Sequence, residues 1–140
     1  MRSTFGVIFF VLAAWAVASG KTKTNATTIP VKGFHYTIEV SSLKEAAAYY
    51  EKIFEMKPSY ELSGVVGFVI ADGFSINLHE GRPVKKSDNL TIAVNEIKKL
   101  FERFEGEKIQ VVQAPKKAED GHAIIGIIRD LDGNEISFAE

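Results

Sequence analysis

An alternating segment followed at once by an amphipathic helix constrains this chain more than any other feature. Residues 34–40 alternate between apolar and polar side chains, which predicts a half-buried strand. Ser41 or Ser42 follows, and a serine oxygen can cap a helix by accepting a backbone N–H of its first turn. The next twelve residues carry an apolar stripe at three- and four-residue spacing: Leu43, Ala46, Ala47, Tyr50, Ile53 and Phe54. Lys57-Pro58 is expected to end this helix.

The same order of elements then occurs twice. Three strands are predicted after the first helix, at residues 59–62, 65–71 and 74–80, and a loop follows at 81–88. The second series is a strand at 89–94, a helix at 96–104 and strands at 109–113, 122–129 and 135–139. Gly106 is expected to end the second helix in the left-handed conformation, and residues 114–121 are interpreted as a charged loop. The chain therefore contains a structural repeat of about 55 residues, with modules at about 33–81 and 88–140.

Two such modules side by side predict an α+β domain in which helices cover one sheet face and the other face curls into a cleft. A polar sheet face is either simply solvated or a concave ligand site, and the pattern leaves both alternatives open. The polar residues predicted to point into the cleft are His35, Thr37, Glu39, Ser75, Asn77, His79, Asn89, Thr91, Glu135 and Ser137.

The beginning of the chain resembles a targeting segment. Arg2 precedes an apolar run at residues 5–17, and small residues follow, so residues 1–20 are predicted to be a signal peptide. Residues 21–31 are predicted to be a flexible linker, and residues 32–140 the folded domain. A secreted or extracytoplasmic protein without stable membrane insertion is expected; the alternative is an anchor formed by an uncleaved segment. Glycosylation sequons occur at Asn25 and Asn89.

Composition excludes several classes of function. The 140 residues carry a net charge of -1, so nothing indicates a nucleic-acid partner. The absence of cysteine excludes disulfides, thiolate metal sites and a cysteine nucleophile. The motifs of serine hydrolases, phosphate-binding loops and zinc proteases are also absent.

Three stretches resemble the vicinal oxygen chelate superfamily, which includes glyoxalase I, extradiol dioxygenases, fosfomycin-resistance enzymes and bleomycin-resistance binding proteins. Residues 35–40 and 49–54, H-Y-T-I-E-V and Y-Y-E-K-I-F, resemble the opening of the family's first module. Residues 89–97 resemble the opening of its second module, and residues 129–137, R-D-L-D-G-N-E-I-S, resemble its closing motif. The resemblance covers nearly all of residues 33–140. It implies paired βαβββ modules that form a cup-shaped, mostly antiparallel sheet with the helices outside.

The resemblance also locates the metal ligands of the family's enzymes. Those enzymes use a histidine in the first strand, a carboxylate in the fourth, a histidine opening the second module and a final glutamate. By position these fall on His35, Asn77, Asn89 (or Thr91) and Ser137, so His35 is the one strong ligand retained. A displaced site of His35, His79 and Glu135 is an alternative, as is metal-free acid–base chemistry by His35 with Glu39 or Glu135. His122 is interpreted as a surface residue.

These features predict a secreted, metal-free protein that binds a small molecule and resembles the bleomycin-resistance type. No cofactor is expected, although a divalent metal stays open as an alternative. One alternative is a divergent metal-dependent lyase or dioxygenase, and another is a secreted interaction protein with a vestigial cleft. A homodimer is expected by analogy with the superfamily alone.

Overall fold

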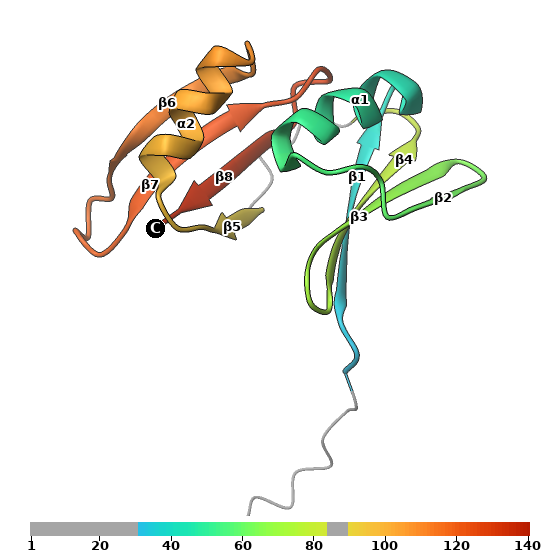
Figure 1. Ribbon diagram of the computed structural model, residues 1–140, viewed down its shortest axis with the longest axis horizontal. Coiled ribbons are helices and arrows are strands. Elements are labelled where there is room, and N and C mark those ends of the chain that lie inside the picture. The colour runs from blue at the N-terminus through green and yellow to red at the C-terminus, as the bar shows by residue number, and fades with distance from the viewer. Residues whose placement is uncertain (1–30, 84–89) are drawn as a thin grey trace, which may run out of the picture. The chain divides into compact units, whose positions relative to one another are not determined.

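The computed structural model describes residues 31–83 and 90–140, and Val31–Glu140 forms one compact unit (Figure 1). The predicted signal peptide, nearly all of the predicted linker and both sequon asparagines, Asn25 and Asn89, lie outside the described residues. Within the described ranges, no helix is both long enough and apolar enough to cross a membrane.

The first module is a strand, a helix and three further strands. Its elements are β1 (Phe34–Val40), α1 (Leu43–Phe54), β2 (Tyr60–Leu62), β3 (Val65–Ala71) and β4 (Phe74–Glu80). They form a four-stranded sheet of order β1-β4-β3-β2, in which β1 is parallel to β4 and the other pairs are antiparallel. Ser42 caps α1 by accepting the Glu45 N–H at 3.4 Å. The helix ends at Phe54, earlier than the Lys57-Pro58 signal, because Glu55 takes the left-handed conformation.

The second module repeats this topology. Its elements are β5 (Thr91–Ala93), α2 (Ile97–Gly106), β6 (Gln110–Lys117), β7 (Ile124–Arg129) and β8 (Glu135–Ala139). The sheet order is β5-β8-β7-β6, again with one parallel pair, β5 and β8. The predicted α+β fold of two βαβββ modules is thus confirmed, as two separate four-stranded sheets.

Two local predictions for the second module were wrong. Residues 114–117 belong to β6 and are not a loop: two register shifts on β6 accommodate the irregular stretch while its ladder with β7 continues. Gly106 is the last residue of α2 and has no positive φ; Lys108 instead has a φ of 59°. The N-terminus of α2 also lacks a side-chain cap of its own, and Glu140 Oε2 accepts the Ile97 N–H at 3.0 Å.

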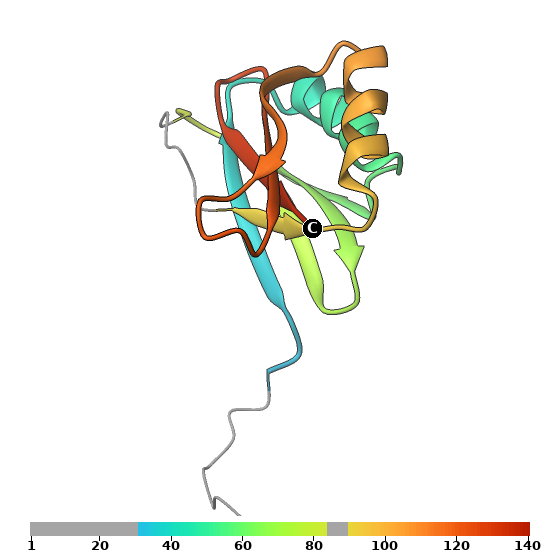
Figure 2. The same ribbon diagram turned by 90° about the vertical axis from the view of Figure 1, so that its left-hand side faces the viewer.

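One hydrophobic core runs through both modules. Both helices lie on the same side of the strands (Figure 2), and their apolar stripes pack against the sheet residues of that side. The predicted stripe of α1 is confirmed, since Ala46, Tyr50 and Ile53 are buried. In the second module Phe101, Phe104 and Phe138 form a cluster of tilted and edge-on rings.

The turn between β7 and β8 holds the second module against the first. Asp130 is buried in this turn and accepts the Tyr50 hydroxyl of α1 at 2.8 Å. Asp132 accepts both the backbone N–H and the hydroxyl of Ser41, at 3.0 and 2.5 Å. Because these bonds join residues about 80 to 90 positions apart, the closing motif fixes how the two modules meet.

Candidate functional site

The face of the first sheet that points away from the helices carries its polar residues in rows. Strand register places His35 of β1, Ser75 of β4 and Val69 of β3 side by side. The next row contains Thr37, Asn77 and Gly67. Because side chains alternate along a strand, all of these point to the same face, opposite Ile38 and Ile76 in the core.

Hydrogen bonds connect side chains from three strands of this sheet, which are β1, β2 and β4. His35 Nδ1 lies 2.6 Å from the Ser75 hydroxyl oxygen, and Ser75 itself is buried. The Tyr60 hydroxyl of β2 donates to Asn77 Oδ1 and lies 3.5 Å from the Ser75 oxygen. The result is a polar network of His35, Ser75, Asn77 and Tyr60 across the open face, called here the His35 network.

Gly67 allows Tyr60 to reach this network. Tyr60 pairs with Gly67 across β2 and β3, and its ring lies directly over that residue. A Cβ added at Gly67 would come within 2.0 to 2.6 Å of the ring carbons of Tyr60. A glycine is therefore required here because the tyrosine must cross β3 to meet Asn77.

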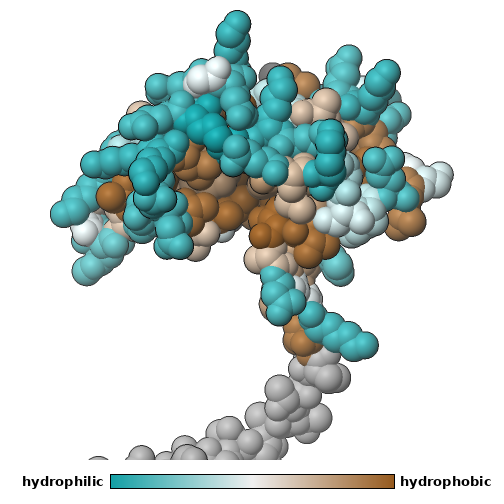
Figure 3. Space-filling model, in the orientation of Figure 1, coloured by the Kyte–Doolittle hydropathy of each residue, from teal (hydrophilic) through white to brown (hydrophobic). Residues whose placement is uncertain are grey.

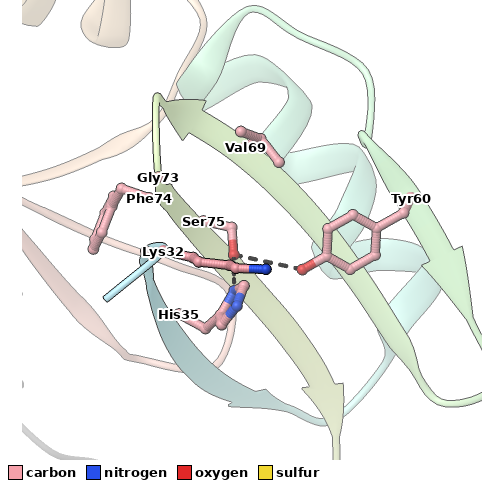
Figure 4. Close-up of a pocket in the computed structure, with 8 residues that line it drawn as sticks. Lys32, His35, Tyr60, Val69, Gly73, Phe74 and Ser75 are labelled. Atoms are coloured by element: carbon pink, nitrogen blue, oxygen red, sulfur yellow. Dashed lines mark hydrogen bonds between the residues drawn. The ribbon is translucent and has the colours of Figure 1, made fainter. Parts of the chain in front are cut away.

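A pocket of about 270 Å³ opens beside the His35 network (Figure 4). Ser75, His35 and Tyr60 supply its polar wall, and the figure shows their side chains converging on the Ser75 hydroxyl. The rest of the lining consists of Lys32, Gly33, Val69, Gly73 and Phe74. The pocket thus combines polar groups with apolar walls, as small-molecule sites do.

The structure groups some of the predicted cleft residues and separates others. His35, Ser75 and Asn77 come together, and Thr37 is exposed on the same face. Glu39 and His79 pair at the other end of the sheet; His79 lies four residues from Ser75, or about 13 Å along the strand. In the second module, Glu135 binds Arg129 at 2.5 Å, and Thr91 pairs with Ser137. Asn89 lies outside the described residues.

Tyr60 and Lys32 were not predicted as site residues. Tyr60 stands in a three-residue strand whose facing direction is not evident from so short a pattern. The available signal was Gly67, because a glycine inside an apolar strand marks a close approach by another group. Lys32 precedes the first strand, and no sequence pattern linked it to the site.

The model of the Glyoxalase/Bleomycin resistance protein/Dioxygenase superfamily matches residues 34–138, which is most of the chain. The chain belongs to this superfamily. No curated protein matches its sequence.

Solved structures of the superfamily share the fold at low sequence identity. A glyoxalase / bleomycin resistance protein from Catenulispora acidiphila has a TM-score of 0.64 and 18% identity, covering 77% of this chain and 96% of that one. A genomically encoded fosfomycin resistance protein from Listeria monocytogenes has a TM-score of 0.64 and 21% identity, covering 76% of this chain and 89% of that one.

A glyoxalase I mutant from Zea mays has a TM-score of 0.63 and 20% identity. The match covers 77% of this chain, but the chain spans only 44% of the maize protein. At these identities the similarity to each structure concerns the fold alone.

The donor set of this superfamily member does not fit the metal site of the family's enzymes. Of the positions that the resemblance assigns to ligands, only His35 bears a strong donor. Asn77 Oδ1 already accepts the Tyr60 hydroxyl. Across residues 31–83 and 90–140, no three His, Cys, Asp or Glu side chains gather closely enough to hold an ion, so the alternative of His35, His79 and Glu135 has no support there.

A second hollow lies between the two modules, where apolar surface gathers (Figure 3). It measures about 310 Å³, and its lining includes Phe54, Ile70, Ile92 and Leu100. Its charged residues already bind one another, since Arg103 Nε lies 3.5 Å from Glu55 and the guanidinium also binds backbone carbonyls of α1. The two charged residues of this lining are thus paired with each other, whereas His35, Ser75 and Tyr60 line the first pocket as a connected polar group, so the candidate site is assigned to the pocket beside the His35 network.

Proposed function

We propose that this superfamily member binds a small molecule in the pocket beside the His35 network and that it does so without a resident metal ion. The observation that supports the proposal most is the network itself. Its four side chains form mutual hydrogen bonds on an open sheet face, and they border a pocket with apolar walls.

The chemistry of the side chains supports binding rather than metal-assisted catalysis. Amide and hydroxyl groups orient a ligand by hydrogen bonds but are weak ligands for a transition metal. In this chain, amide or hydroxyl side chains stand at three of the four positions that the resemblance assigns to metal ligands. His35 is the one strong donor at the fourth. The proposal therefore places the chain nearer to the binding members of the superfamily than to its metal enzymes.

The experiment is a fragment screen by NMR on uniformly ¹⁵N-labelled, chelator-treated protein. We expect at least one class of fragment to shift the backbone amide signals of Gly67, Ser75 and Asn77. The Ser75→Ala variant should weaken that binding about fivefold to tenfold, the loss expected for one hydrogen-bonding group. Ser63→Ala, a matched change at an exposed turn residue, should leave the affinity unchanged.

Two results would contradict the proposal. Fragments that shift only residues of the hollow between the modules would place the site elsewhere. A complete absence of fragment binding would favour the alternative of an interaction protein with a vestigial cleft. In that case no small molecule should raise the melting temperature either, since a ligand specific to the native state must stabilise it.

We also propose that the protein is exported, on the sequence evidence of residues 1–20 alone. Expression in a secreting host should yield a mature protein whose N-terminus lies near residue 21. Intact-mass measurement would show this directly, and retention of residues 1–20 in a membrane-bound product would favour the anchor.

A further inference from the structure

Resting on the proposed function, we propose that the pocket selects small anions with a flat apolar body, such as aromatic carboxylates. Lys32 and His35 line this pocket, and each carries a nitrogen donor that has no partner among residues 31–83 and 90–140. The walls of the pocket are apolar. The class of ligand follows from what these donors can bind.

The first donor is Nε2 of the His35 ring. Ser75 has one hydroxyl proton, and its oxygen lies 2.6 Å from His35 Nδ1 but 3.4 Å from Asn77 Oδ1 and 3.5 Å from the Tyr60 oxygen. The proton makes a good hydrogen bond only to His35, because the other two contacts are long. With Nδ1 as acceptor, the neutral ring carries its proton on Nε2.

Nε2 also carries a proton when the His35 ring is a cation. In the imidazolium form both ring nitrogens are donors, so Nε2 still offers an N–H. In the part of the chain that the structure describes, Nε2 has no hydrogen-bond partner. His35 therefore offers a donor to a ligand as the neutral Nε2–H tautomer and as the cation.

The second donor is the ammonium group of Lys32. Its side chain lines the same pocket and runs across the opening beside His35 and Ser75 (Figure 4). No ion pair or hydrogen bond engages it among residues 31–83 and 90–140. Asp72 precedes Gly73 in the neighbouring turn, but its carboxylate is not part of the lining, so the charge facing the pocket is positive.

The walls define the rest of the ligand. Val69 and Phe74 present apolar surface, and Val69 is 44% exposed although it lies in a strand row beside Ser75. Gly33 and Gly73 approach so closely that a Cβ on Gly33 would lie 2.4 Å from the Gly73 carbonyl oxygen. These two glycines present only backbone to the pocket, which leaves room for a flat body beside the apolar walls.

Three compounds of nearly the same shape test the inference: benzoate, benzamide and benzamidine, which are anionic, neutral and cationic. Each is titrated into the ¹⁵N-labelled protein while the amide signals of Ser75 and Phe74 are followed. We expect benzoate to bind about fivefold tighter than benzamide, the upper range for one solvent-exposed charge pair, and benzamidine to bind most weakly. Lys32→Met should abolish the preference for benzoate, whereas Lys98→Met, at an exposed position of α2, should preserve it.

A long-range ¹H–¹⁵N spectrum of the histidine rings tests the first donor independently, and it should show a proton on Nε2 of His35. Equal or tighter binding of benzamide or benzamidine at these residues would overturn the inference but leave a small-molecule site in place. A neutral Nδ1–H tautomer would also overturn it. Failure of all three compounds to shift Ser75 or Phe74, combined with an empty fragment screen, would overturn the proposed function as well.

Discussion

Tyr50 connects the two modules through one buried hydroxyl group. Its side chain is fully buried in α1, and the hydroxyl donates to Asp130 Oδ2 at 2.8 Å. The same carboxylate accepts two backbone N–H groups of its own turn, from Asp132 and Asn134. Burial raises the pKa of Tyr50 well above its ordinary value, and the neighbouring Asp130 charge raises that pKa further.

This pKa shift makes a pH-dependent prediction for Tyr50→Phe. The unfolded chain ionises Tyr50 at about pH 10, whereas the folded protein keeps it protonated, so its contribution to stability is complete below pH 10 and is lost as pH rises further. Below pH 9 the variant should lose about 1.5–3 kcal/mol of unfolding free energy, as expected for a bond to a charged acceptor. Near pH 10.5 the difference should shrink by about 0.8 kcal/mol.

Urea denaturation of both proteins between pH 7 and 10.5 measures this difference. Titration of the other tyrosines and of the lysines is common to both proteins and cancels in the comparison. A difference that stays constant or widens with pH would contradict the assigned role of Tyr50.

Gly67 makes a second prediction at the residue scale. In Gly67→Ala the new Cβ would collide with the Tyr60 ring, which is partly exposed and can swing away from β3. We expect a modest loss of stability, about 1 kcal/mol, together with loss of the Tyr60–Asn77 hydrogen bond. In a Tyr60→Ala background the same glycine change should cost less, and a double-mutant cycle measures this coupling. Additive effects would show that Tyr60 does not lie over Gly67.

At the scale of elements, α2 supplies the C-terminal cap of α1. Arg103 donates to the carbonyl oxygens of Lys52 and Ile53, at 2.6 and 2.8 Å, and its guanidinium also lies over the Phe104 ring. Carbonyls in the last turn of a helix have no partner within that helix. One side chain of the second module therefore completes a helix of the first.

Arg103→Met should lower the unfolding free energy by about 2 kcal/mol, because two carbonyls lose a charged donor. Arg103→Lys should recover little of this, since a single ammonium cannot match the planar fork of the guanidinium. Chemical denaturation measures both, with Lys98→Met as a control on the exposed side of the same helix. Full recovery by lysine would show that charge alone, rather than the two directed bonds, stabilises the end of α1.

Alternation predicted some elements well and others poorly. The bounds of β1, β3, β4 and β8 agree with the sequence prediction because each of these segments is alternating or continuously apolar between clear turn signals. The end of β6 was missed because Pro115, Lys116 and Lys117 read as a loop, and only pairing with β7 across two register shifts keeps them in the sheet.

The candidate site shows the same limit. The shared face of His35, Ser75 and Asn77 follows from a period of two. The contribution of Tyr60 depends on where β2 lies relative to β3, which is a property of the folded sheet. The strand pattern of the sequence also gives both sheets a polar face, and it does not show which of the two faces holds a pocket.

At the scale of the whole molecule, the two modules share one core but differ on their open faces. The first sheet carries the His35 network, whereas Arg129 and Glu135 of the second sheet bind each other at 2.5 Å, and Ile125 and Ile127 lie beside them on β7. The closing turn and Arg103 hold these unlike modules together. The repeat thus produces one domain in which a single module bears the proposed ligand site.

The central claim is a ligand pocket that works without a metal ion, and a thermal-shift series tests it most directly. Chelator-treated protein is melted alone and with Zn²⁺, Ni²⁺, Mn²⁺ or Mg²⁺, in parallel with His35→Ala. We predict melting curves that no ion shifts specifically, together with stabilisation by pocket-binding compounds in the absence of metal. An increase of several degrees with one ion, lost in His35→Ala, would contradict the claim and indicate a metal-dependent lyase or dioxygenase of the superfamily.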